Sequence, residues 1–233
     1  MASALVRIVL SGTLLILMAG SVHADDRLWI LTGDVYKSDY YFGGGLIIPF
    51  WGNNHLGDGW VQRYWLDTFS YTYDADGRDI DANVFGAEAM IGYQASRPGL
   101  SGAAYFGVRY SNTSLSPDDP NGALRGEQFW PKAQLEGEAQ LSPAWRLNGI
   151  VAYTFILDGY WTRLRLLYGL SGGKYIGPEV VAQGDPNYNA QKIGVAFGGI
   201  AIASKVFLTL KGGYRFQSGA DSPYIGAELV GEF

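Results

Sequence analysis

The chain has 233 residues, a formal net charge of −5 and a sequence pI near 5.0, and its sequence contains no cysteine. The missing cysteine excludes disulfide scaffolds, Cys-ligated metal centres and thiol catalysis, and the acidic balance provides no basic footprint for nucleic acid. Hydrophobic residues make up 48% of the chain, which excludes intrinsic disorder, yet the mean hydropathy is only +0.01.

The first segment is predicted to be a secretory signal peptide. Arg7 supplies a positive charge, Ile8–Met18 is a short apolar stretch, and Val22–Ala24 has the small-x-small form of a signal peptidase site. An N-terminal membrane anchor is the alternative, although the apolar core is short for one. We expect cleavage after Ala24, so that residues 1–24 are the signal peptide and residues 25–233 form one domain.

Beyond this segment, apolar and polar residues alternate with a period of two, which predicts strands. Between residues 128 and 141, for example, Trp130, Lys132 and Gln134 share one face, and Phe129 and Leu135 lie on the other. The predicted strands cover residues 27–36, 40–50, 60–73, 81–94, 102–112, 126–141, 144–157, 160–170, 175–183, 190–202, 205–216 and 223–233. Turn sequences such as Asp76-Gly77 separate them.

A soluble sandwich would alternate in the same way, but three features favour a membrane barrel. Segments of about 10–14 residues suit tilted membrane spans of about 9–11 residues. The predicted connections partly follow the rule of short periplasmic turns and long outer loops, with 113–125 the longest outer loop. The last strand keeps an apolar face up to Phe233, and this end resembles the insertion signature of bacterial outer-membrane proteins. The fold class expected is therefore all-β: a single antiparallel up-and-down transmembrane β-barrel of about 12 strands (10–12), surrounded by outer-membrane lipid.

Aromatic residues are expected to form a girdle at one rim of this barrel. Four tryptophans and two phenylalanines map to the predicted periplasmic rim: Trp29, Trp51, Trp60, Trp145, Phe50 and Phe233. Their position is typical of residues that lie at the membrane–water interface.

The inward face is predicted to carry charges of both signs, and two interpretations stay open. The residues are Glu88, Arg109, Lys132, Glu136, Glu138, Arg163, Arg165, Lys211, Arg215, Glu228 and Glu232. They form either a structural network of ion pairs that fills the bore or a polar path for a hydrophilic ligand. Trp130 and Trp161 share this face and are candidate platforms for sugar rings.

No catalytic residue, metal ligand or cofactor-binding residue is predicted. Glu136 and Glu138 could form a catalytic pair in principle, but residues i and i+2 share a face in any strand. Asp74–Asp81 concentrates carboxylates without the EF-hand order, and a solvated hairpin is the better interpretation. Cleavage after Ala24 leaves His55 as the single histidine, and no Ser-His-Asp arrangement can be proposed.

Several local strings resemble the BcsS family of cellulose biosynthesis proteins. The most specific are Leu115–Pro120 (LSPDDP), Tyr160–Arg165 (YWTRLR) and Ile176–Glu179 (IGPE), and weaker ones are Gly57–Trp60, Gly92–Gln94 and Tyr188–Gly194. The resemblance covers roughly residues 27–233. It implies a secreted outer-membrane accessory component that is encoded with bacterial cellulose synthase. It transfers no catalytic residues, because the family has none that are agreed.

The leading hypothesis is a non-enzymatic accessory protein that assists export or surface assembly of cellulose. Its partners would be the cellulose chain and components of the cellulose synthase complex, and Trp130, Trp161, Arg163 and Arg165 would contact the glucan. The alternatives are a general porin or adhesin barrel unrelated to cellulose, and a barrel enzyme acting on lipid or polysaccharide.

Overall fold

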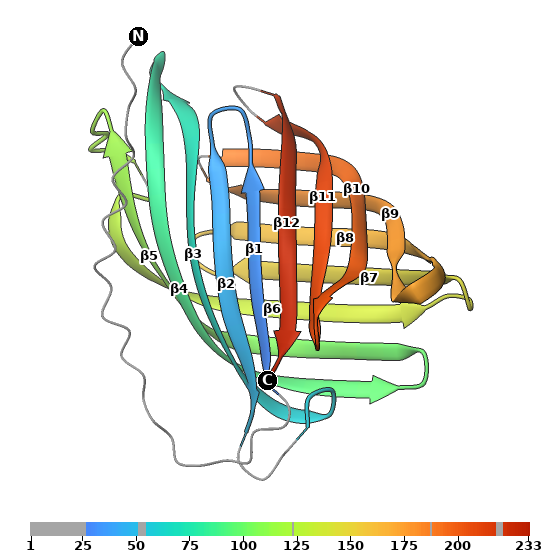
Figure 1. Ribbon diagram of the computed structural model, residues 1–233. Coiled ribbons are helices and arrows are strands. Elements are labelled where there is room, and N and C mark those ends of the chain that lie inside the picture. The colour runs from blue at the N-terminus through green and yellow to red at the C-terminus, as the bar shows by residue number, and fades with distance from the viewer. Residues whose placement is uncertain (1–26, 51–54, 123, 187, 218–220) are drawn as a thin grey trace.

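The computed structural model describes residues 27–50, 55–122, 124–186, 188–217 and 221–233. The predicted signal peptide, its cleavage site and Trp51 lie outside these residues. The strands form a closed antiparallel barrel (Figure 1). They are β1 (Leu28–Val35), β2 (Tyr40–Pro49), β3 (Gly59–Ala75), β4 (Arg78–Arg97), β5 (Leu100–Ser116), β6 (Gly126–Gln140), β7 (Trp145–Thr154), β8 (Gly159–Gly169), β9 (Tyr175–Asp185), β10 (Tyr188–Ala203), β11 (Val206–Gln217) and β12 (Ser222–Glu232). A single turn of 3-10 helix, η1 (Ser171–Gly173), connects β8 to β9. No helix in the described ranges is long and apolar enough to cross a membrane.

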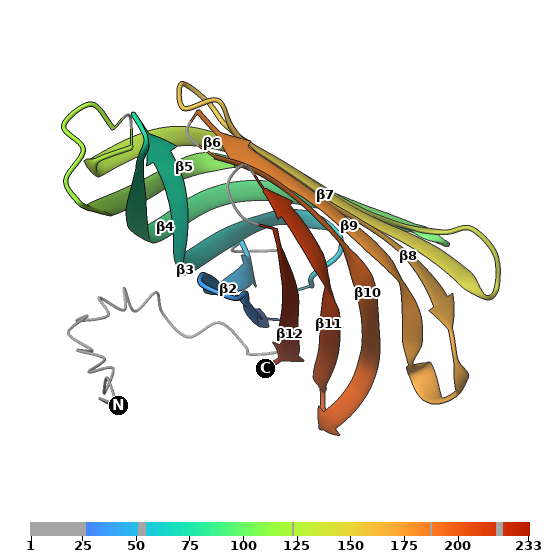
Figure 2. The same ribbon diagram turned by 90° about the horizontal axis from the view of Figure 1, so that it is seen from above.

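The barrel closes where the first strand meets the last. β1 pairs antiparallel with β12 from Leu28 opposite Glu232 to Val35 opposite Ile225. Every other strand pairs with its neighbours in the sequence, so the connectivity is up-and-down. Viewed from above, the strands wrap around one interior (Figure 2). Closure removes all free edges, which is what backbone groups require in lipid. The predicted fold class is confirmed, with β12 at the seam.

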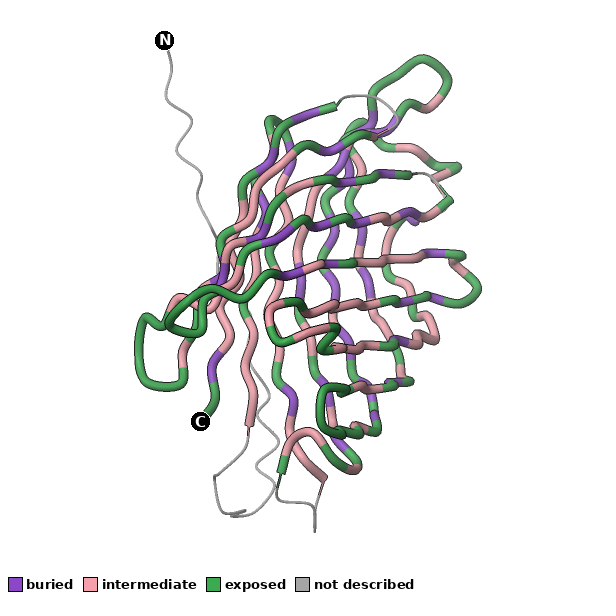
Figure 3. Tube along the Cα trace, turned by 90° about the vertical axis from the view of Figure 1, so that its right-hand side faces the viewer, coloured by how far each residue is buried: buried purple, intermediate pink, exposed green. Residues whose placement is uncertain are grey.

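Burial alternates along the strands as the sequence pattern predicts (Figure 3). On β4 the inward Glu88 is 5% exposed, whereas the outward Phe85 and Ile91 are 48% and 52% exposed. The outward residues are large and apolar around the whole ring, as lipid contact demands. The polar residues therefore face the bore.

Strands β3, β4 and β5 extend beyond their predicted ends, and the β3–β4 hairpin rises above the β1–β2 hairpin (Figure 1). The β3–β4 turn consists of Asp76 and Gly77, with φ of 53° and 76°. Both angles are positive, as a two-residue type I′ hairpin turn requires. The backbone N–H of Gly77 also donates to Asp74 Oδ1 at 3.2 Å. The acidic stretch Asp74–Asp81 is thus a hairpin, as predicted.

Strand β7 is shorter than the predicted range of 144–157. It ends at Thr154, and the turn before β8 includes Ile156 and Asp158 with φ of 71° and 55°. Tyr153 supports this turn, because its hydroxyl donates to Asp158 Oδ1 at 2.5 Å. The alternation in Phe155 and Leu157 concealed the turn, since positive φ is not visible in hydropathy.

The two ends of the barrel are named here by their connections. The terminal rim holds the start of β1, the end of β12 and the connections 50–58, 98–99, 141–144, 170–174 and 204–205. The far rim holds 36–39, 76–77, 117–125, 155–158, 186–187 and 218–221. The expected contrast in loop length is only partial, because 50–58 is as long as 117–125. We orient the terminal rim toward the periplasm, following the rule for outer-membrane barrels.

Outward aromatic residues gather near both rims. At the terminal rim, Trp60 and Trp145 are 57% and 40% exposed, and each meets a tyrosine edge-to-face, Tyr93 and Tyr168 respectively. Near the far rim, Phe85, Tyr110 and Phe129 form consecutive ring contacts. Two further pairs in ring contact lie at the end of β7 and the turn after it, and on β11. This arrangement supports the predicted girdle and adds a second one.

The glycines of β2 leave room for the inward ring of Trp65 to pack directly against the β2 backbone. A Cβ at Gly43 would lie 2.9 Å from the Trp65 ring, and one at Gly45 would lie 2.4 Å from both that ring and the Tyr64 carbonyl oxygen. Close packing against Trp65 therefore explains the glycines at positions 43 and 45.

Candidate functional site

The register between neighbouring strands determines which side chains lie together on the inward face of the barrel. Residues directly opposite each other in antiparallel strands share a face. One row across this face runs from Trp65 on β3 through Glu88 on β4 and Arg109 on β5 to Trp130 on β6. In each such row, polar and aromatic side chains of neighbouring strands lie side by side and point into the bore.

The first network lies inside β3–β6 and is centred on Glu88. It comprises Arg63, Asp67, Glu88, Arg109 and Lys132. Glu88 accepts from Arg63 Nη1 at 2.8 Å, from Arg109 Nη1 at 2.6 Å and from Lys132 Nζ. Arg109 also donates to both carboxylate oxygens of Asp67, each at 2.8 Å. The side chain of Glu88 is 1% exposed. A buried carboxylate is stable only when it is paired in this way.

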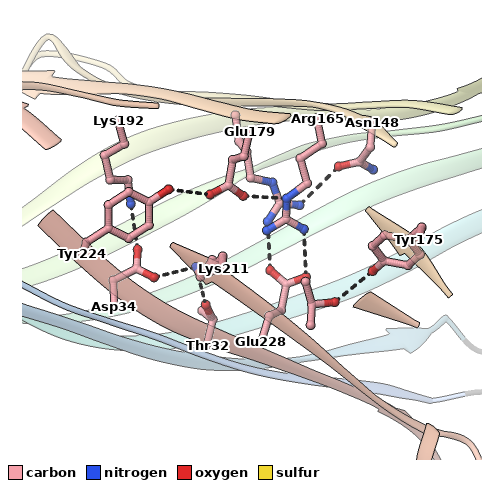
Figure 4. A network of polar contacts seen from close by, with 12 residues as sticks. Thr32, Asp34, Asn148, Arg165, Tyr175, Glu179, Lys192, Lys211, Tyr224 and Glu228 are labelled. Atoms are coloured by element: carbon pink, nitrogen blue, oxygen red, sulfur yellow. Dashed lines mark hydrogen bonds and ion pairs between the residues drawn. The ribbon is translucent and has the colours of Figure 1, made fainter. Parts of the chain in front are cut away.

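The second network lies inside β8–β12 and β1 (Figure 4). Its charged members are Asp34, Arg163, Arg165, Glu179, Lys192, Lys211 and Glu228. Arg165 Nε donates to Glu179 at 2.6 Å, while Arg163 and Arg165 reach from β8 to Glu228 on β12 at 2.9 and 3.3 Å. At its other end, Asp34 binds Lys192 and Lys211, each at 2.7 Å. Ion pairs thus join strands that are not neighbours in the barrel wall.

A third charged contact lies closer to the far rim. Arg215 on β11 donates to Asp39 in the β1–β2 turn at 2.6 Å, and both side chains are 3% exposed. The guanidinium carbon of Arg215 also lies 3.8 Å from the ring centre of Tyr36, a close cation–π contact. This pair fixes the β1–β2 turn over the interior.

Aromatic and apolar contacts lie inside the barrel beside the networks. Tyr71 on β3 and Tyr188 on β10 have ring centres 5.1 Å apart, although four strands separate them along the shorter way around the ring. Toward the terminal rim, a buried cluster of Ile47, Val61, Met90 and Tyr105 fills the space inside β2–β5. The tyrosine contact therefore joins strands that are far apart in the barrel wall, and buried side chains occupy the interior at both levels.

The structure brings together three of the four predicted contact residues. Arg163 and Arg165 bind the same carboxylate, Glu228. Trp161 lies beside them, with its ring centre 5.9 Å from the guanidinium carbon of Arg163. The guanidinium of Arg165 is engaged by two carboxylates, and its side chain is 3% exposed. Both arginines thus belong to the network that fills the bore.

Trp130 lies apart from this group. It is opposite Arg109, whereas Trp161 is opposite Ala152 and, through it, Gln134. Four residues on β6 separate these levels, which is about 13 Å along a strand. The Trp130 indole nitrogen is buried and has no protein acceptor. The two tryptophans therefore lie at different levels of the barrel wall.

Sequence reasoning missed several charged members of the bore. The inward set predicted above lacks Asp34, Asp39, Arg63, Asp67, Glu179 and Lys192, which are all buried. The five that lie on strands each stand as a single charge among apolar or small residues of their face, such as Glu179 between Gly177 and Val181, whereas Asp39 lies in the β1–β2 turn. A lone charge at an inward position of a strand was the signal that could have revealed these five.

The two candidate catalytic carboxylates have protein partners. Glu138 binds Arg146 at 3.4 Å, and Glu136 accepts from Gln134 Nε2 at 2.5 Å. Among the described residues, no group of three or more His, Cys, Asp or Glu side chains is placed to hold a metal ion.

A comparison with protein-family models shows which family this barrel belongs to. The model of the cellulose biosynthesis protein BcsS matches residues 32–233. The chain belongs to the BcsS family. The family assigns this BcsS protein a role in cellulose biosynthesis and argues against a barrel unrelated to that process. A search of the curated proteins finds no match.

Solved structures similar to this BcsS protein are outer-membrane barrels. The transport unit of the autotransporter AIDA-I from Escherichia coli is 10% identical with a TM-score of 0.53, and the match covers 94% of this chain and 93% of that one. A Pseudomonas aeruginosa FadL homologue is 8% identical with a TM-score of 0.52, covering 90% and 91%. The KdgM porin in complex with disordered oligogalacturonate is 10% identical with a TM-score of 0.50, covering 88% and 99%. At these identities the likeness concerns the fold, which is the fold of outer-membrane barrels.

Proposed function

We propose that this BcsS protein is a non-enzymatic outer-membrane accessory protein that assists export or surface assembly of cellulose. The family match over residues 32–233, on a closed barrel, carries the proposal. A signal peptide cleaved after Ala24 would deliver the chain to the periplasm. Its partners would be the glucan and components of the cellulose synthase complex.

Of the two roles, the filled bore favours surface assembly. A conduit needs a continuous path wide enough for a sugar chain, and wide aqueous channels occur in barrels of 16–18 strands. In this barrel of twelve strands, ion pairs and the Tyr71–Tyr188 contact join opposite parts of the wall. The glucan would then cross the membrane elsewhere, and the BcsS barrel would act beside its exit.

Trp130 and Trp161 remain the proposed glucan contacts. Indole rings stack on the apolar faces of sugar rings, and both tryptophans are partly exposed near the far-rim ends of β6 and β8. Arg163 would position Trp161 through its cation–π contact with the indole ring. Neither Arg163 nor Arg165 would hold sugar itself, because their guanidinium groups already bind carboxylates.

The absence of enzymatic activity is part of the proposal, and the state of the carboxylates supports it. Glu88, Glu179 and Glu228 each bind Arg or Lys. A general acid must hold a proton near neutral pH, and cationic neighbours favour the ionised form instead. The barrel-enzyme alternative would need a free carboxylate pair in the bore.

Deleting the gene and following the glucan tests this proposal. We expect the deletion strain to bind less Congo red and to release loose glucan into the medium, since chains would leave the cell without being assembled. Glucan retained in the periplasm would instead indicate an export role. Unchanged amount and attachment of cellulose would contradict both.

Complementation tests the contact residues. Trp130→Ala and Trp161→Ala should each lower Congo red binding while leaving the amount of folded barrel unchanged, measured as the heat-modifiable band of the outer-membrane fraction. Trp145→Ala is the matched control, because this girdle tryptophan faces outward. Full cellulose assembly by both inward variants would remove the tryptophans from the proposal.

A further inference from the structure

The two rims of the barrel carry opposite charge. Among the described residues of the terminal rim there are five cations and three anions: Arg27, Arg97, Arg146, Lys174 and Lys205 against Asp58, Glu138 and Glu232. The far rim has three cations and ten anions: Lys37, Arg78 and Arg125 against Asp74, Asp76, Asp79, Asp81, Asp118, Asp119, Glu127, Asp158, Asp185 and Asp221. These sets leave out the inward pair of Asp39 and Arg215. The rims therefore differ in sign, at +2 (5 − 3) and −7 (3 − 10).

The cations of the terminal rim are placed where headgroups would lie. Arg97, Lys174 and Lys205 are exposed and stand at or beside the connections between strands. Glu138 is engaged by Arg146 at 3.4 Å, and Glu232 by Lys205 at 3.9 Å. Positive charge thus prevails at this rim.

Outward aromatic residues mark the depth of this rim in the membrane. The Trp60–Tyr93 and Trp145–Tyr168 pairs lie near the strand ends that carry these cations. Aromatic belts of this kind lie at headgroup level. The basic side chains that follow them therefore reach the layer of lipid phosphates.

The cations are also spread around the barrel. Arg27 precedes β1, Arg97 ends β4, Lys174 lies between β8 and β9, and Lys205 lies between β10 and β11. A protein partner would select one side of the rim, whereas a lipid leaflet surrounds it. We propose that the terminal rim binds the phosphate headgroups of anionic phospholipids and that this binding holds the rim in its leaflet. The inference is independent of the glucan role.

Lipid selection by the purified barrel tests this inference. The folded full-length protein is placed in nanodiscs of equal parts phosphatidylglycerol and phosphatidylcholine, and the retained lipids are identified by native mass spectrometry. We expect phosphatidylglycerol to be retained preferentially. Raising the salt concentration should weaken this preference, because salt screens exposed charges.

Two triple variants with the same change in net charge locate the effect. Arg97→Gln with Lys174→Gln and Lys205→Gln should reduce the preference, by about fivefold for each charge that contacts a headgroup. Lys37→Gln with Arg78→Gln and Arg125→Gln, on the far rim, should leave it unchanged. Heat-modifiable gel mobility shows that each variant is folded.

Absence of a lipid preference in the wild-type protein would overturn the inference and would point to an acidic protein as the partner of this rim. Equal loss in both triple variants would also overturn it, because net charge alone would then explain the effect. The salt series on the wild-type protein decides the matter even if a variant fails to fold.

Discussion

Buried charges connect the strands of this barrel at the level of single residues. Glu88 binds cations from β3, β5 and β6, and Glu228 joins β12 to β8. Removing one partner from a buried cluster leaves the others charged and unpaired, and this costs more than the net contribution of the intact pair.

Replacing Glu88 with glutamine should therefore destabilise the barrel. We expect Glu88→Gln to lower the free energy of unfolding by about 3 kcal/mol, because three buried cations lose their shared anion. Guanidinium unfolding of the purified protein in detergent measures the change.

Glu138→Gln provides the matched control for this variant. Its side chain is 38% exposed and its partner lies 3.4 Å away, so the loss should not exceed about 1 kcal/mol. Equal destabilisation by both variants would contradict a special role for the buried network.

The glycines of β2 allow a second test at this scale. Gly45→Ala places a Cβ 2.4 Å from the Tyr64 carbonyl oxygen, and such overpacking should cost about 1–3 kcal/mol. Gly149→Ala on β7 is the control, because its Cβ would meet Leu164 at an ordinary 3.5 Å. The temperature at which the folded gel band disappears should fall for Gly45→Ala only.

Most strands could be predicted from the alternation, but their pairing geometry could not. Every predicted strand is present, because lipid on one side and a polar interior on the other impose a period of two. The predicted end of β7 was wrong, because the positive φ angles of Ile156 and Asp158 leave no trace in the hydropathy pattern. The inward orientation of Arg163 and Arg165 followed from the same period, whereas their shared partner Glu228 depends on closure between β1 and β12, which brings distant strands together.

The seam between β1 and β12 is the element on which closure depends. Leu31 and Leu229 face each other across it, and opposed Cα atoms lie about 4.5–5.5 Å apart, within the range of a disulfide. The chain has no cysteine of its own. Leu31→Cys with Leu229→Cys should therefore form one intramolecular disulfide under oxidation, seen as a mobility shift on a non-reducing gel.

An out-of-register pair controls for chance collision at the seam. Ile225 is opposite Val35, four residues away from Leu31 along β1. Leu31→Cys with Ile225→Cys should stay reduced under the same conditions. A disulfide in this second pair, and none in the first, would show that the register of the seam is different.

The whole molecule is a barrel whose interior is occupied by its own side chains. Two charge networks, the Tyr71–Tyr188 contact and an apolar cluster near the terminal rim fill the bore. Solved barrels of similar fold include a porin, so the strands alone do not decide whether a channel exists; the inward side chains do. This occupied bore is the reason for proposing that the BcsS barrel takes part in assembly of cellulose outside the membrane rather than in its passage.

Electrical recording in a planar lipid bilayer tests this central claim most directly. The purified barrel, shown to be folded by its heat-modifiable mobility, is inserted and held under a steady voltage. We predict no stepwise open-channel current, because the ion pairs and the tyrosine contact close the bore. Regular current steps that increase in number with the amount of inserted protein would contradict the account.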